Sequence, residues 1–161
     1  RNHCPFVISF NAISSLEKDF VDASIACHPV RLLADMDFHC NSTLPLITPY
    51  SMLTSSLQER LSSKKIYDFG LTIEPDSFAF HDNYCVCPSS LVLAYALSVC
   101  VSGGVESLAL AGFDGYIPGD PRNDEVEKIL DLFTRSSVNL RYHSVTPTSF
   151  KNLPACSIYG I

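Results

Sequence analysis

Apolar residues along the chain gather in short runs that end at proline, asparagine or glycine. Short β-branched and aromatic runs bounded in this way are typical of strands buried in a sheet. The first such run, Phe6 to Phe10, ends at Asn11, and the run from Ile66 to Ile73 is weakened as a strand by Gly70. The predicted strands cover residues 6–10, 23–27, 44–48, 66–73, 78–80, 108–111 and 140–145.

Helical periodicity separates these strands. The predicted helices cover residues 51–61, 91–101 and 123 or 124 to 135, and a short one begins at Ser14 or Ser15 with Glu17 in its first turn. Residues 31–37 fit either a helix or an extended segment. Strands alternating with helices favour one three-layer, Rossmann-like α/β domain with a mainly parallel sheet over residues 1–161. The helix over 91–101 is apolar almost all round, so we expect it at the centre of that domain.

Composition excludes several classes of protein. Of the 161 residues, 47% are hydrophobic and 17% charged, which suits a globular protein and argues against disorder. A net charge of -6 argues against nucleic-acid and anionic-membrane partners, which reward clustered Lys and Arg. No apolar run is long enough for a clear membrane span. The chain starts without Met and enters a strand-like run at once, so we expect a C-terminal fragment of a longer polypeptide.

The seven cysteines make no recognisable framework. Their number is odd, and Cys27 and Cys100 lie within apolar runs, where cysteine acts as a small hydrophobic residue. Cys85 and Cys87 are separated by one residue, not by the two of a zinc knuckle or a thioredoxin motif. We therefore expect free thiols in a reducing cytoplasm and no metal site. The absence of GxGxxG, Walker A, GxSxG and HExxH motifs points the same way, to a chain without a cofactor.

The turn from Gly112 to Tyr116 is the first candidate site, because it directly follows an apolar strand. Ligands of open α/β sheets bind outside the carboxyl ends of the strands. Gly112 and Gly115 permit close backbone approach, Asp114 can accept hydrogen bonds from sugar hydroxyls, and Tyr116 can donate one or act as an acid or base. The alternative is structural: Asp114 caps the turn and Tyr116 packs beneath it.

Two further groups of polar residues are candidates. Ser89 and Ser90 begin the apolar helix, where free N–H groups can hold an anion; equally, the two serines can simply cap the helix. Asn11 follows the first strand, and His28 and Arg31 follow the second, where they can contact a nucleotide or a sugar phosphate. For His28, a plain turn residue beside Pro29 is the alternative.

The segment from Ser89 to Tyr116, together with the closing strand up to Pro147-Thr148-Ser149, resembles the core of bacterial sialyltransferases that use CMP-sialic acid. In that family a serine-led helix precedes a strand that ends in a Gly-x-Asp-x-Tyr turn. The resemblance implies that Ser89 or Ser90, Gly112 and Tyr116 surround a nucleotide sugar. It also implies a catalytic histidine before the last strand. Residues 117–139 hold no histidine.

The strings ALAGFDGY, NDEVEKILDLF and IACHPVRLLAD are similar to the Rossmann-like C-terminal domain of HMGL-like aldolases, lyases of the 4-hydroxy-2-oxovalerate aldolase type. That resemblance implies an accessory domain, not catalytic by itself, whose partner is the TIM-barrel domain of its parent chain. The leading hypothesis is that it binds a sugar nucleotide or a related anion. The alternatives are a glycosyltransferase that uses Tyr116 and Asp114 in catalysis, and a structural domain that forms homo-oligomers.

Overall fold

The computed structural model describes residues 5–12, 20–136 and 138–157, and the helix predicted from Ser14 or Ser15 lies outside these ranges. The chain is mixed α/β with mostly parallel strands, as predicted. Its strands are β1 (Ile8–Phe10), β2 (Ala23–Ile25), β3 (Leu46–Thr48), β4 (Ile66–Asp68), β5 (Gly70–Ile73), β6 (Ala79–Phe80), β7 (Tyr84–Cys87), β8 (Ser107–Leu110) and β9 (Arg141–Ser144). Its helices are α1 (Pro29–Ala34), α2 (Met36–Asn41), α3 (Ser55–Arg60), α4 (Val92–Ser102) and α5 (Pro121–Arg135), with a 3₁₀ turn, η2, at Tyr50–Met52.

Within the described residues, the strands form three sheets in place of the one that the sequence predicts. β1, β2, β3 and β4 lie side by side in that order, all parallel. β7 lies between β5, which is parallel to it, and β6, which is antiparallel. β8 and β9 form a parallel pair. The predicted parallel character is therefore correct for the first and last sheets, and the middle sheet is mixed.

The division between the first two sheets falls at Phe69. The sequence predicts one strand over residues 66–73, whereas β4 and β5 pair in different sheets and meet at this one residue. Gly70 starts β5 because the neighbouring strand comes too close for any side chain. A Cβ at Gly70 would lie 2.8 Å from the Cβ of Tyr84. The same glycine that weakens the strand prediction is thus required for the β5–β7 pairing.

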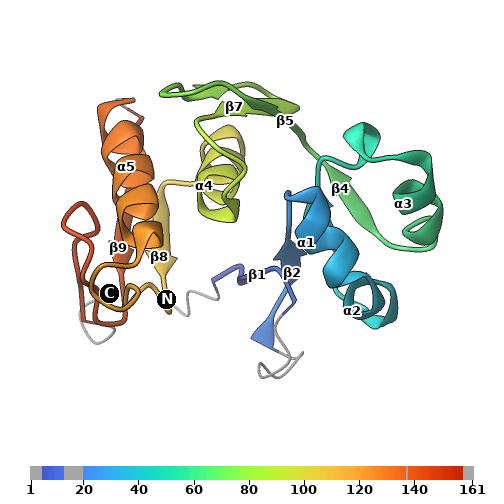
Figure 1. Cartoon of the computed structure of the whole chain (residues 1–161), viewed down its shortest axis with the longest axis horizontal. Helices are drawn as coiled ribbons and strands as arrows, with labels where there is room; N and C mark the ends of the chain where they lie inside the picture. Colours follow the sequence, from blue (N-terminus) through green and yellow to red (C-terminus); the bar gives the residue numbers. More distant parts are fainter. Residues whose placement is uncertain (1–4, 13–19, 137, 158–161) are drawn as a thin grey trace.

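Side chains on the central strands alternate between two apolar clusters, as the pleat of a strand requires. Ile25 and Ile47 join the larger cluster, which contains the buried apolar residues of α4 and α5. Ala26 and Leu46 join the smaller cluster, which contains Leu32 of α1, Met36 of α2 and Leu57 of α3. Figure 1 shows α5, β8 and β9 at one end of the molecule, α1 to α3 at the other, and α4 between them.

Helix α4 occupies the centre of the larger cluster, as its apolar sequence predicts. Residues 93–98 and Cys100 are all buried. Tyr95 is fully buried, and its hydroxyl donates a hydrogen bond of 2.5 Å to the carbonyl of Phe69. Burial raises the pKa of this phenol far above its usual range, so the hydroxyl keeps its proton and remains a donor. Tyr95 therefore holds the residue at which the chain passes from one sheet to the next.

Several element boundaries differ from the predicted ones for local reasons. α5 begins at Pro121, not at Asn123 or Asp124, because the Asp120 side chain accepts the N–H of Arg122 at 3.0 Å and caps the helix. Residues 51–61 divide at Thr54 into η2 and α3. The ambiguous segment 31–37 is helical and belongs to α1 and α2. Strand β7 has no counterpart in the prediction.

Replacing Tyr95 with Phe tests the importance of the link to Phe69. Tyr95→Phe keeps the ring and removes the hydroxyl donor from a buried carbonyl, which costs about 1–3 kcal/mol. We expect the free energy of unfolding in urea to fall by that amount. The matched control is Tyr67→Phe, at a tyrosine that is 46% exposed, where the change should stay within about 0.5 kcal/mol. Equal unfolding curves for Tyr95→Phe and the unsubstituted protein would contradict the assignment.

A second buried group makes stability depend on pH. His39 on α2 is fully buried, and in the described structure neither of its ring nitrogens has a hydrogen-bond partner. Burial lowers the pKa of His39; the charge of Asp35 opposes this shift and that of Lys64 adds to it. The folded state therefore binds the proton less readily than the unfolded state.

The free energy of unfolding should consequently decrease as pH falls below 6.5, the ordinary pKa of this side chain. The loss should continue until pH passes the lowered pKa of the folded state, because only the unfolded chain gains a proton in this window. His39→Leu removes the group, and we expect the decrease between pH 7 and pH 5 to become shallower. Urea denaturation across that range measures it. An identical slope in His39→Leu would exclude His39 as the source.

Candidate functional site

The carboxyl ends of β1 and β2 bring two predicted site segments together. Both strands are parallel and adjacent, so the residues that follow them share one edge of the sheet. Asn11 follows β1, and its N–H donates to the carbonyl of Ile25 in β2 at 2.9 Å. Its φ of 54° lies in the left-handed region, which asparagine tolerates better than most residues. His28 follows β2 and is exposed.

The start of α4 lies at the same edge. The thiol of Cys27, two residues past β2, donates to the carbonyl of Ser90 at 3.3 Å. The hydroxyl of Ser89 accepts the N–H of Leu91, also at 3.3 Å. Leu91 is the N-cap residue of α4, and no side chain caps the helix. The alternative in which a serine caps this helix is therefore not what the structure shows, although Ser89 orders the segment before it.

The turn after β8 completes the arrangement. The ring of Phe113 packs edge-to-face against Phe10, the last residue of β1, with centroids 5.7 Å apart. This contact brings the turn, through Phe113, to the end of β1, where Asn11 follows. Three segments that the sequence places far apart thus meet at the carboxyl edge of the first sheet. We call this edge the strand-end rim and define it as Asn11, Cys27–His28, Ser89–Ser90 and Gly112–Tyr116.

Hydrogen bonds to the segment after β9 fix the turn itself. Gly112 donates its N–H to the Thr146 hydroxyl at 3.0 Å, and the carbonyl of Asp114 accepts the N–H of Ser149 at 3.2 Å. Both glycines have positive φ, 79° at Gly112 and 100° at Gly115. A Cβ at Gly112 would meet nothing within 4 Å, so the backbone there faces open space. The Asp114 side chain is exposed.

The structural alternative requires Tyr116 to pack beneath the turn. In the structure its side chain is instead 42% exposed. Its backbone is held by Asn123 on α5, whose side-chain carbonyl accepts the N–H of Tyr116 at 2.8 Å. The amide of Asn123 donates to the carbonyls of Tyr116 and Ile117 at 3.3 and 3.2 Å. The guanidinium of Arg122 lies over the phenol ring, 4.1 Å from its centroid.

Arg122 is itself held by a carboxylate. Its Nε and Nη2 donate to the two oxygens of Asp120 at 2.9 and 2.6 Å. These hydrogen bonds lower the pKa of Asp120 to about 2, so the carboxylate keeps its charge down to strongly acidic pH. Sequence reasoning missed Asp120, Arg122 and Asn123 because it placed the start of α5 two or three residues late. Asp120 followed by Pro121, a helix-capping pair, was the signal that was available.

The remaining predicted residues have local partners. Arg31 lies on α1 and forms an ion pair with Asp35, four residues on in the chain, at 2.9 Å. The carbonyl of His28 accepts the N–H of Leu32 and so begins α1. Among the described contacts, none joins the side chain of either residue to Asn11 or Ser90. His28 belongs to the strand-end rim by position, whereas Arg31 lies one turn farther along the helix.

Six of the seven cysteines lie in the described residues, and all six are free thiols. Cys27, Cys85, Cys87 and Cys100 are buried, and only Cys40 and Cys156 are exposed. Burial raises the pKa of Cys27 to about 12 and that of Cys100 to about 11. Both thiols therefore stay protonated at neutral pH and act as core side chains, as the sequence predicts.

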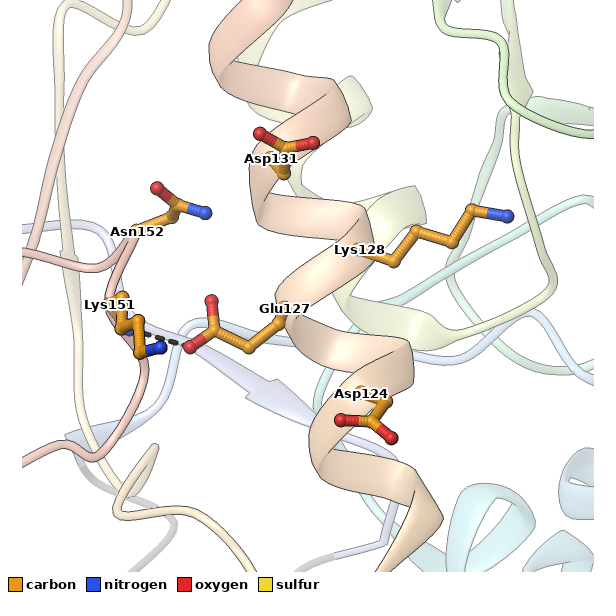
Figure 2. A pocket seen from close by; sticks show the side chains of 6 residues that line it. All are labelled: Asp124, Glu127, Lys128, Asp131, Lys151 and Asn152. Atoms are coloured by element: carbon orange, nitrogen blue, oxygen red, sulfur yellow. Dashed lines mark hydrogen bonds between the residues drawn. The ribbon is translucent and has the colours of Figure 1, made fainter.

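An open surface hollow of about 470 Å³, lined by no residue of the strand-end rim, lies between α5 and the segment after β9. Figure 2 shows Glu127 pointing from α5 toward Lys151, whose backbone N–H it accepts at 2.7 Å, with Lys128 pointing to the other side. The hollow is lined by Asp124, Glu127, Lys128, Asp131, Lys151 and Asn152. Its charges are mixed and it is open to solvent, so it offers no enclosed binding volume.

Comparison of the chain with protein-family models, with curated proteins and with solved structures found no match. Within residues 5–12, 20–136 and 138–157, no three His, Cys, Asp or Glu side chains come together as a metal site requires. None of the helices in those ranges is both long enough and apolar enough to span a membrane.

Gly115→Ala tests whether the turn depends on its close approach to Ser149. A Cβ at Gly115 would collide with the Ser149 hydroxyl oxygen and lie 3.3 Å from the Ser149 Cβ. Gly119 has a similar φ of 86° with nothing within 4 Å, so Gly119→Ala is a matched control for backbone strain alone.

We expect Gly115→Ala to lower the free energy of unfolding by about 1–3 kcal/mol more than Gly119→Ala, the usual cost of overpacking. Adding Ser149→Ala to Gly115→Ala removes the colliding oxygen and should recover part of that difference. Thermal and urea unfolding of the three variants measure the effect. If Gly115→Ala and Gly119→Ala lower the free energy of unfolding equally, backbone strain at positive φ accounts for the whole effect and the approach to Ser149 does not contribute.

Proposed function

We propose that this chain is a three-layer, Rossmann-like α/β domain that binds a sugar nucleotide or a related anionic ligand at the strand-end rim. In this proposal it serves as an accessory domain of an aldolase-type protein in a reducing, cytoplasmic setting, and the barrel of that protein is its partner. The support for the parent protein is the sequence similarity alone. The support for the ligand site is structural as well.

The observation that carries the proposal is the meeting of three chain segments at one edge. Asn11 is joined to β2 by its N–H, Ser90 is joined to Cys27, and Phe113 packs on Phe10. A shared edge at the carboxyl ends of parallel strands is where open α/β sheets bind their ligands. Helices on both sides of the first sheet, with separate apolar clusters, support the three-layer arrangement.

Each part of the strand-end rim suits a different part of such a ligand. The exposed Asp114 carboxylate can accept hydrogen bonds from sugar hydroxyls. Gly112 leaves its side of the backbone open to a close approach. The first-turn N–H groups of α4, which no side chain caps, can donate to a phosphate. This division explains how an anion can bind although the rim itself has no Lys or Arg.

The glycosyltransferase alternative assigns chemistry to the same residues, with Tyr116 as the proton-transfer group and Asp114 orienting the acceptor. The sialyltransferases, whose resemblance suggests this alternative, carry a catalytic histidine before the last strand. The corresponding interval of this chain, residues 117–139, contains no histidine. An accessory binding role accounts for the strand-end rim without that missing group. We therefore propose binding and not catalysis by this domain alone.

Isothermal titration with CMP, UMP, UDP-sugars and CMP-sialic acid tests the proposal. The site variant is Asp114→Ala, and the control is Glu125→Ala, an exposed carboxylate on α5 outside the strand-end rim. A lost hydrogen bond to a charged group costs about 1.5–3 kcal/mol, so Asp114→Ala should weaken sugar-nucleotide binding by tenfold or more. Glu125→Ala should leave it unchanged. No heat and no thermal shift with any of these compounds would refute the proposal.

A further inference from the structure

We propose that Tyr116 and Arg122 form a stacking platform for the nucleobase of the ligand, and that the ring of Tyr116, not its hydroxyl, is the group that matters. This inference rests on the proposed nucleotide site and specifies how one part of the ligand is recognised. It departs from the catalytic role that the glycosyltransferase alternative gives to Tyr116.

The first support is the position of the Arg122 guanidinium over one face of the phenol ring. Its carbon lies 4.1 Å from the ring centroid, within the range of a cation–π contact. Tyr116 is 42% exposed although that face is covered. An exposed aromatic ring with one face covered by a guanidinium offers its remaining surface to a planar ligand.

The second support is that hydrogen bonds from neighbouring residues hold both Tyr116 and Arg122 in place. Asp120 holds Arg122 through two hydrogen bonds and also accepts its backbone N–H. Asn123 holds the backbone of Tyr116 and Ile117 through three hydrogen bonds. All five of these residues belong to the first turn of α5 or to the segment just before it. With its backbone held by these hydrogen bonds and one face of its ring covered by Arg122, Tyr116 loses little conformational entropy when a base stacks on it.

The third support is the charge balance around Arg122. Asp120 already neutralises the guanidinium through a bidentate contact, so a phosphate gains less from Arg122 than from an unpaired cation. The planar side chain is thereby left to pack against the ring. This separates the base, at Tyr116, from the phosphate, for which the first-turn N–H groups of α4 remain. Stacking tolerates any base, so selectivity among bases is expected to be modest.

Four variants separate stacking from hydroxyl chemistry. Tyr116→Phe keeps the ring and Tyr116→Leu removes it. The matched controls are Tyr67→Phe and Tyr67→Leu, because Tyr67 on β4 is 46% exposed and carries the Lys65 ammonium over its ring at 5.3 Å. Circular dichroism and thermal unfolding check that each variant is folded. The probes are CMP, UMP and ribose 5-phosphate, which has the phosphate and sugar but no base.

Stacking predicts that Tyr116→Phe binds CMP and UMP within twofold of the unsubstituted protein, and that Tyr116→Leu loses about tenfold or more. Ribose 5-phosphate should bind the two variants equally, and both Tyr67 variants should bind like the unsubstituted protein. Loss of nucleotide binding in Tyr116→Phe, or normal binding in Tyr116→Leu, would overturn the stacking role while leaving the nucleotide site in place. No binding of any nucleotide to the unsubstituted protein would overturn the site and this inference together.

A spectroscopic readout keeps the test decisive if Tyr116→Leu does not fold. The chain has no tryptophan, so Tyr116→Trp introduces a single fluorescent reporter at the proposed platform. Stacking predicts that CMP and UMP quench this indole, whereas ribose 5-phosphate leaves its emission unchanged. Tyr67→Trp is the control and should respond to none of them. Equal quenching at both positions would show nonspecific contact and contradict the proposal.

Discussion

The contact between Tyr95 and Phe69 is the constraint on which the rest of this structure depends. Tyr95 lies in the first half of α4, and Phe69 is the residue between the first sheet and the second. The larger apolar cluster takes residues from all three sheets and packs them on this one helix. Short strands of two to four residues cannot bury enough surface alone, so their common attachment to α4 organises them.

That constraint also determines where the strand-end rim can form. Once α4 is fixed in the cluster by its buried residues, its first turn has to lie near the end of β2, and the Cys27–Ser90 hydrogen bond records that position. The turn after β8 reaches the same edge because β8 follows α4 directly and Phe113 packs on Phe10. The rim is thus a consequence of core packing, and its polar residues need contribute little to stability.

The elements that the sequence predicted well are those with a strong local signal. The apolar helix α4 and the amphipathic helix α5 were found within three residues at each end, since their periodicity is long and regular. The division at Phe69 and strand β7 were missed because both arise from the close approach of Gly70 to Tyr84, fourteen residues away. Of the strand-end rim, the strand-end rule located Asn11 and the turn at Gly112, and the start of the apolar helix located Ser90. Arg122 and Asn123 were missed because the predicted start of α5 fell two or three residues late, so their contacts with Tyr116 were not expected.

The turn after β8 meets two requirements of the proposed binding role by different groups. The turn needs a rigid backbone, and Asn123, Thr146 and the N–H of Ser149 supply it through hydrogen bonds. It also needs side chains that do not take part in holding the backbone, and those of Asp114 and Tyr116 stay exposed. A turn whose only role was structural would gain by burying its aromatic ring, as Phe113 does against Phe10. Tyr116 instead stays at the surface under the Arg122 guanidinium, which Asp120 holds in place. This arrangement fits the proposed stacking of a ligand on the ring, because a ring held in advance loses little conformational entropy on binding.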